Sequence, residues 1–284
     1  MRYLKDLLLD KKFRFSFIVM LSLTFLVILS LFSPYEPTQW QVVPEELPPS
    51  FKHPFGTTSL GQDLFWTICS AVKNSLVFAI ITAAISRAIA VTLGMLSGFK
   101  KGAFDKVLMA ISDALISLPR IPILILIGAI FKESLRLSTL AIILASIGWA
   151  WDARVIRSQV LSLRERDFTY TALLSGSKAL SIVFKEFFPH ITPIIFASIL
   201  NNMMWAIGIE TTLSVLGLTN LLVPTLGTTL YWAISYQALF LGYWWWIVFP
   251  VLIIVFLFVS IYLLSISISE YLDPRMRIQR IGQA

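Results

Sequence analysis

Long apolar runs alternate with short polar segments along most of this chain. A helix that crosses a membrane needs about 20 consecutive, mostly apolar residues. Six stretches approach or exceed that length: 13–33, 74–99, 107–131, 137–158, 191–217 and 243–269. The pattern therefore predicts an all-α, polytopic membrane protein with six transmembrane helices.

Lys and Arg are unevenly distributed among the segments that connect these runs. Cytoplasmic loops of membrane proteins carry an excess of both residues. With the N-terminus inside, the basic clusters in 1–14, 100–106, 154–185 and 275–280 all lie on the inner side. Both termini are therefore expected in the cytoplasm. The charge-free stretch 218–242 would put the basic tail outside if it crossed the membrane, so we expect an external helix or a re-entrant piece there.

The same pattern divides the chain into two parts. Residues 1–73 hold the first apolar run, which we interpret as a retained anchor helix, and a long, Pro-rich, acidic external loop. Residues 74–284 hold the other five predicted transmembrane helices, which form the core of the molecule.

Composition narrows the class of protein further. Hydrophobic residues make up 57% of the 284 residues and charged residues only 14%, whereas soluble domains carry about 25% charged residues. Most of the net charge of +7 lies in short loops beside apolar runs, where it sets topology, so we expect no binding of nucleic acid.

The residues that usually form metal, redox or nucleotide sites are few. The single Cys69 excludes an intrachain disulfide, and His53 and His190 lie on opposite predicted sides, which disfavours a metal site. The chain contains no Gly-x-x-x-x-Gly-Lys-Ser/Thr sequence that would cradle nucleotide phosphates. We therefore expect neither an enzyme nor a cofactor bound by this chain.

The polar segment 164–189, here called the coupling segment, separates the fourth and fifth apolar runs. Its sequence predicts a short helix, a break at Gly176 and a second amphipathic piece that ends at Pro189. Glycine permits a sharp exit from a helix, and proline is expected to stop the segment before the next transmembrane helix. A partner protein outside the membrane can bind such a surface.

This segment resembles the coupling motif of ABC importer permeases, Glu-Ala-Ala-x-x-x-Gly followed by Pro. Ala172, Gly176 and Pro189 match the motif, whereas Tyr170 and Thr171 stand where the family has Glu and Ala. In that family the short helix lies in a groove of the ATPase subunit. The resemblance implies that these residues, flanked by Arg164 and Arg166, couple the chain to an ATPase, and the Tyr indicates a more apolar contact or weaker coupling through this subunit.

Further motifs occur in the order in which one subfamily has them. They are His53–Thr57 with Gly61 and Asp63; Gly94, Gly98 and Asp105; Asp113 and Pro119; Gly148, Trp149, Arg154 and Arg157; Glu210–Leu218; Trp244 and Trp245; and Leu272–Arg275. Together they resemble the dipeptide/oligopeptide/nickel permease family, specifically its shorter second (C-type) permease subunit.

The resemblance implies a defined set of partners. They are a homologous permease that completes the pathway, two ATPase subunits that bind ATP and Mg²⁺, and an external solute-binding protein. The chain would then be a multi-pass protein of a bacterial or archaeal cytoplasmic membrane. Its substrate would be a di- or oligopeptide, an oligosaccharide or a nickel chelate, of which we favour peptides.

Four ionisable residues fall within the predicted transmembrane helices: Glu210, Asp113, Arg87 and Arg120. Charged groups at membrane depth face a partner or a wet cavity. Each is therefore a candidate for lining the pathway, and each can equally be a structural hydrogen-bond or ion-pair partner. For Arg87 the candidate partners are Asp113 and Glu210.

Two alternatives from other classes stay open. An ion-coupled secondary transporter would need intramembrane carboxylates, which Asp113 and Glu210 supply, and an internal repeat, which we do not detect. A membrane scaffold without transport activity is the second alternative. Co-purification with an ATPase distinguishes the importer from both.

Overall fold

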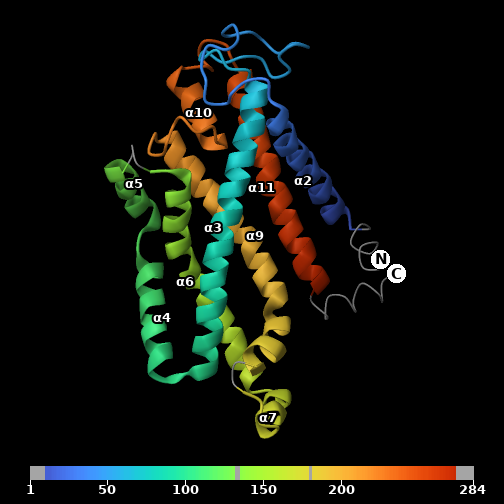
Figure 1. The fold of residues 1–284 in the computed structure, drawn as a ribbon, viewed down its shortest axis with the longest axis vertical. Coiled ribbons are helices and arrows are strands. Elements are labelled where there is room, and N and C mark those ends of the chain that lie inside the picture. The colour runs from blue at the N-terminus through green and yellow to red at the C-terminus, as the bar shows by residue number, and fades with distance from the viewer. Residues whose placement is uncertain (1–9, 132–134, 179–180, 273–284) are drawn as a thin grey trace. The chain divides into compact units, whose positions relative to one another are not determined.

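Residues 10–131, 135–178 and 181–272 are described by a computed structural model (Figure 1). Its elements are α2 (Lys11–Leu29), the 3-10 helix η1 (Ser30–Phe32), α3 (Leu64–Lys100), α4 (Gly102–Ser117), α5 (Arg120–Phe131), α6 (Leu137–Arg164), α7 (Asp167–Leu174), the π-helix η2 (Ile182–Phe187), α9 (Phe188–Val215), α10 (Leu226–Ser235) and α11 (Trp245–Leu272). Within these ranges no β-strand forms. The all-α prediction is therefore confirmed for the described residues.

Five helical stretches are long and apolar enough to cross a membrane, and the bent pair α4–α5 makes a sixth if it counts as one span. The five are Lys11–Phe32, Leu64–Lys100, Leu137–Arg164, Ile182–Val215 and Trp245–Tyr271. The orientation stays a prediction, because the ends of the chain (1–9 and 273–284, with the basic tail and most of the Leu272–Arg275 motif) lie outside the described residues.

The second apolar run forms a longer helix than expected. α3 begins at Leu64, ten positions before the predicted start, because Asp63 caps it: its Oδ1 accepts hydrogen bonds from the backbone N–H groups of Phe65 and Trp66, at 3.0 and 3.4 Å. The added turns bury Leu64 and Ile68 completely. The domain boundary predicted after residue 73 therefore falls inside α3, and that division stays a prediction.

The third apolar run is not one kinked helix. α4 and α5 meet at an angle of 78°. Leu118 has an extended backbone (φ −68°, ψ 136°), the conformation that a following proline favours, and Pro119 has no N–H with which to continue the helix. Asp113 and Arg120 therefore lie on different helices.

The described chain divides into two compact units. The first unit takes the residues up to Ile80, Arg120–Ala141 and Met204–Leu264, and the second takes Ile81–Pro119, Ile142–Met203 and the residues from Ser265 onward. Four long helices, α3, α6, α9 and α11, contribute residues to both units.

The first unit contains the loop 33–63, which lacks regular secondary structure but is held by specific bonds. His53 Nδ1 lies 2.7 Å from Asp63 Oδ2, and both side chains are buried. The indole Nε1 of Trp245 donates to the carbonyl oxygen of Thr57 at 3.1 Å. A side chain at Gly56 (φ +76°) would lie 2.8 Å from that indole nitrogen. The motif that begins at His53 thus encodes a folded turn that leads into α3.

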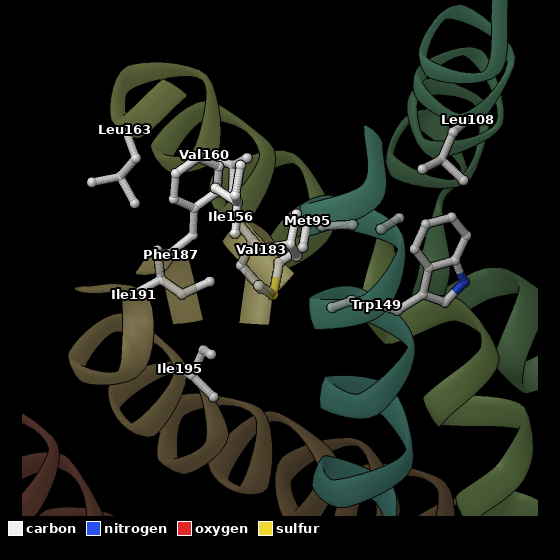
Figure 2. Close-up of a cluster of buried hydrophobic side chains, with 14 residues drawn as sticks. Met95, Leu108, Trp149, Ile156, Val160, Leu163, Val183, Phe187, Ile191 and Ile195 are labelled. Carbon is white, nitrogen blue, oxygen red and sulfur yellow. The ribbon is translucent and has the colours of Figure 1, made fainter. Parts of the chain in front are cut away.

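The core of the second unit is a cluster of apolar side chains from α3, α4, α6, η2 and α9. Figure 2 shows Ile156, Val160, Val183 and Phe187 lying together in this cluster. Close approach of α3 and α6 depends on glycine, because a Cβ atom at Gly94 would lie 2.6 Å from the carbonyl oxygen of Ala153. The cluster therefore joins the helices on both sides of the coupling segment.

Candidate functional site

One side of α7, in the coupling segment, is attached to the second unit. The Phe168 ring stacks on His190, with ring centroids 5.3 Å apart and planes 9° from parallel, and meets Phe187 edge-on at 6.3 Å. The buried Thr169 hydroxyl donates to the carbonyl oxygen of Leu163 at 2.8 Å. Ala172 packs against the apolar cluster. This side of α7 therefore packs against the end of α6 and the start of α9.

The opposite side of α7 is open. The side chain of Tyr170 is 55% exposed and that of Leu174 is 89% exposed, and residues four apart share one face of a helix. The Thr171 hydroxyl donates within the helix to the carbonyl oxygen of Asp167 at 3.0 Å. The accessible face of α7 is thus largely apolar, with the phenol of Tyr170 as its polar group.

Gly176 ends this helix in the left-handed conformation, with φ +77°. The N–H of Ser177 donates to the carbonyl oxygen of Ala172 at 3.1 Å, which is the bond expected of a Schellman C-cap. A Cβ atom at Gly176 would meet no other atom within 4 Å. The requirement for glycine is therefore conformational, and the expected sharp exit after α7 is confirmed.

Pro189 does not stop the segment, and this expectation was wrong. A continuous helical stretch runs from Ile182 to Val215, with Pro189 as the second residue of α9. The preceding turn is a π-helix, in which the N–H of Phe188 donates to the carbonyl oxygen of Val183. The wider π-turn shifts the hydrogen-bond register just before Pro189, so the missing proline N–H does not break the helix.

The two arginines that flank the start of the segment differ in their surroundings. Arg164 Nη1 donates to the carbonyl oxygen of Phe99 at 2.9 Å, and its guanidinium lies 5.8 Å from the centre of the Phe99 ring. Arg164 thus connects the ends of α6 and α3. The side chain of Arg166 is exposed.

Arg87 pairs with Asp152, so both partners expected for it were wrong. Its Nη2 lies 2.5 Å from Asp152 Oδ2, and the two side chains are 4% and 20% exposed. Asp113 instead pairs with Arg154. The rotation of α6 decides these contacts, because it turns Asp152 toward α3 and Arg154 toward α4.

A second pair in this unit carries no role in the sequence interpretation. Arg157 donates through Nε and Nη2 to the two carboxylate oxygens of Asp105, each at 2.5 Å, and the Ser97 hydroxyl donates to Asp105 as well. Asp105 and Arg157 both belong to motifs that resemble those of the permease family. That shared resemblance is the feature of the sequence from which a role for the pair could have been predicted.

In the first unit Glu210 is fully buried. Its Oε1 accepts hydrogen bonds from the hydroxyls of Ser214 at 2.7 Å and Thr225 at 2.6 Å. Thr225 is also the N-cap of α10. Among the described residues, Glu210 Oε2 has no hydrogen-bond partner. The carboxyl group thus connects α9 to the start of α10.

Arg120 begins α5 in the same unit. Its guanidinium carbon lies 5.7 Å from the centre of the Trp205 ring, which is the geometry of a cation–π contact. The segment 218–242 contains α10, a helix of ten residues. α10 is too short to cross a membrane, which agrees with the expectation of an external helix or a re-entrant piece rather than a further crossing.

Within the described ranges, no three His, Cys, Asp or Glu side chains lie close enough together to hold a metal ion. A cavity of about 510 Å³ opens in the second unit between α6, α9 and the end of α11. The polar residues that line it are Asp152, His190, Ser198, Asn201 and Ser269. Of these five residues the sequence interpretation considered only His190, as an unlikely metal ligand, because helical rotation decides which residues face a cavity.

Comparison with known proteins shows the family to which this sequence is similar. Residues 90–278 match the family model described as binding-protein-dependent transport system inner membrane component. The chain is 32% identical to the oligopeptide transport system permease protein OppC of Mycobacterium tuberculosis over 237 residues, which is 83% of this chain and 80% of that protein. It is 28% identical to the dipeptide transport system permease protein DppC of Bacillus subtilis over 261 residues, 92% of this chain and 81% of that protein.

The matched residues contain the whole coupling segment, α6 with its three ion-paired residues, and the buried Glu210. The match covers more than half of the chain, and the relatives extend it toward the N-terminus. This chain belongs to the family of binding-protein-dependent transport system inner membrane components.

Proposed function

We propose that this chain is the shorter, second permease subunit of an ATP-binding-cassette importer of di- or oligopeptides. Family membership and the two relatives named as peptide permeases support this function. A homologous permease completes the pathway, two ATPase subunits bind ATP and Mg²⁺, and an external binding protein delivers the peptide. The family match favours this function over an ion-coupled secondary transporter or a scaffold.

The observation that carries the proposal is that α7 is packed against the protein on one side and exposed on the other. Its exposed face offers Tyr170 and Leu174 to a cytoplasmic partner, while Phe168 and Thr169 attach the helix to the ends of α6 and α9. When ATP closes the ATPase dimer, the partner displaces α7, and the packed cluster moves with it because well-packed side chains transmit displacement. The pathway alternates between its two openings in response.

The chemistry of the exposed face defines the groove that receives it. A carboxylate at position 170 would attract a basic group of the ATPase through a charge-assisted bond. Tyr170 offers a ring and one hydroxyl instead, and Leu174 adds apolar area. We therefore expect the ATPase of this system to present an apolar groove with a hydrogen-bond acceptor for the phenol.

Affinity purification from native membranes tests the proposal. A tagged chain in mild detergent should retain a homologous permease and the ATPases, identified by mass spectrometry. Leu174→Glu should remove the ATPases while the second permease stays bound, because a charge enters the apolar contact. Phe51→Glu is the matched control, since Phe51 is fully exposed on the loop of the first unit and should change neither partner.

Peptide uptake by cells that carry these variants gives the functional measurement. Uptake should fall with Leu174→Glu in proportion to the loss of ATPase. A chain that purifies alone or as a homo-oligomer in several detergents would contradict the importer assignment, and neutralising Glu210 and Asp113 would then test the secondary transporter.

A further inference from the structure

The cavity of the second unit combines features that the coupling segment does not use. Its volume of about 510 Å³ lies within the range of about 300–1,000 Å³ typical of small-molecule sites. Two faces line it: Trp151, Asp152 and Val155 on α6, and residues of α9 that include His190 and Asn201. Polar lining is costly in a helix at membrane depth, so it indicates a wet site.

Asp152 is the only acidic residue among the described residues that line this cavity. Its carboxylate is partly accessible, whereas its partner Arg87 is almost fully buried behind it. Arg87 binds one carboxylate oxygen, Oδ2. The carboxylate of Asp152 therefore lines the cavity, whereas the guanidinium of Arg87 does not.

The ion pair between Arg87 and Asp152 leaves part of the arginine without hydrogen bonds to the residues that the structure describes. Within the described part of the chain, Arg87 Nε and Nη1 are buried without hydrogen-bond partners. A buried ion pair contributes little to stability when its remaining donors are unsatisfied. Positioning a carboxylate at the cavity wall accounts for its presence better than stability does.

Trp151 complements this carboxylate. It precedes Asp152 on α6, lines the same cavity and is 56% exposed. An indole face attracts a cation, and a carboxylate accepts charge-assisted hydrogen bonds from an ammonium group. Ser198, Asn201 and Ser269 add neutral hydrogen-bonding groups for the rest of a ligand.

We infer that this cavity is a subsite for a primary ammonium group and that Asp152, oriented by Arg87, is the residue that binds it. The ligand that carries this group is the free amino terminus of a short peptide. This assignment of the ligand rests on the proposed function. The subsite would let the permease recognise the peptide terminus after the binding protein has released it.

Protection of a cysteine in the cavity tests the inference. Asn201→Cys places a thiol in an exposed part of the lining, and the native Cys69 is buried and should not react. The complex, purified from native membranes and placed in phosphatidylcholine nanodiscs, is treated with a water-soluble maleimide. Alanyl-alanine at about twice its Kd should slow labelling about threefold, because only the unoccupied fraction reacts.

The controls separate ammonium recognition from other effects. N-acetyl-alanyl-alanine lacks the charged terminus and should give no protection. In the double variant Arg87→Gln/Asp152→Asn, which removes both charges together, protection by alanyl-alanine should require at least about tenfold more peptide. A Phe51→Cys chain, labelled on an exposed loop outside the cavity, should react equally with and without peptide. The buried native Cys69 should stay unlabelled in the double variant if that variant folds.

Three outcomes would overturn the inference: equal protection by the acetylated peptide, full protection in the double variant, or slow labelling without peptide in nanodiscs that contain phosphatidylethanolamine. The last result would assign the ammonium group to a lipid. If the ATPases co-purify and cells take up peptides while no protection occurs, only the subsite fails. If neither co-purification nor uptake occurs, the proposed function fails as well.

Discussion

At the scale of single residues, three arginines of the second unit are paired with aspartates. Arg87 binds Asp152, Arg157 binds Asp105, and Arg154 binds Asp113. The sequence places one or both members of each pair in apolar surroundings but does not specify the partners. A change of one position along α6 rotates a side chain by about 100°, so only the packed helices decide which charges meet.

Gly94 provides the sharpest test at this scale. We expect Gly94→Val to destabilise the second unit by about 1–3 kcal/mol or more, because the new side chain would collide with the backbone of α6 at Ala153, which cannot move aside by rotating a side chain. Thermal unfolding of the purified chain in detergent measures the effect.

Gly208→Ala is the matched control for that variant. Gly208 also lies within a long helix, but its added Cβ atom would lie 3.6 Å from the nearest atom, in the Phe258 ring, which is an ordinary contact. This substitution should leave the unfolding temperature nearly unchanged. Equal stability of the two variants would show that close approach of α3 and α6 does not depend on glycine.

At the scale of elements, the C-cap of α7 sets the direction in which the chain leaves that helix. Gly176→Ala should weaken this cap by about 1–2 kcal/mol, because a residue with a Cβ atom is disfavoured at φ +77°. Gly176→Asn should be tolerated better, since Asn also occurs at this position of helix caps.

Peptide-stimulated ATP hydrolysis by the purified complex distinguishes the two variants. We expect a clear decrease for the Ala variant and a smaller one for the Asn variant, with the amount of bound ATPase measured in parallel. Identical activities would mean that the conformation at position 176 does not affect coupling.

α10 offers a second test at this scale, because its N-cap is bound to Glu210. Glu210→Leu removes the carboxylate that accepts from the hydroxyls of Ser214 and Thr225, which keep only the hydroxyls of Thr219 and Thr228 as partners. A buried group left unsatisfied costs about 1–3 kcal/mol. Glu210→Gln keeps an acceptor oxygen. Hydrogen exchange of the amides in 226–235 should therefore accelerate in the Leu variant and change little in the Gln variant.

Comparable exchange in both variants would assign Glu210 a role other than attaching α10. A loss of transport in the Gln variant with normal exchange would then favour the alternative that this carboxyl group lines the pathway.

At the scale of the whole molecule, the bent pair α4–α5 decides the topology. If it counts as one span, the chain crosses the membrane six times, and Phe51 and Leu174 lie on opposite sides. If it re-enters on one side, the crossings number five, and both residues lie on the same side.

Cysteine labelling distinguishes these topologies. We expect a membrane-impermeant maleimide to label Phe51→Cys in intact spheroplasts, and to label Leu174→Cys only after the membrane is opened and the ATPases are removed. Both positions are highly exposed, and the native Cys69 is buried. Labelling of both from the outside would contradict six spans and the cytoplasmic position of the coupling segment.

The sequence by itself determined the class of the protein, the approximate positions of its apolar helices, and the segment 164–189 with its break at Gly176. These features depend on local composition: apolar length, glycine conformation and short motifs are properties of neighbouring residues. The start of α3 at Leu64 was missed because its cap, Asp63, lies in a polar loop that masks the helix signal.

The tertiary structure alone decided the ion pairs, the 78° break at Pro119, the passage of helix through Pro189, and the cavity beside Asp152. Each depends on how one helix is rotated and packed against another, or on whether a neighbouring turn can absorb a missing hydrogen bond. Residues far apart in the sequence, such as Arg87 and Asp152, carry no local mark of their contact, since it arises only when the helices pack.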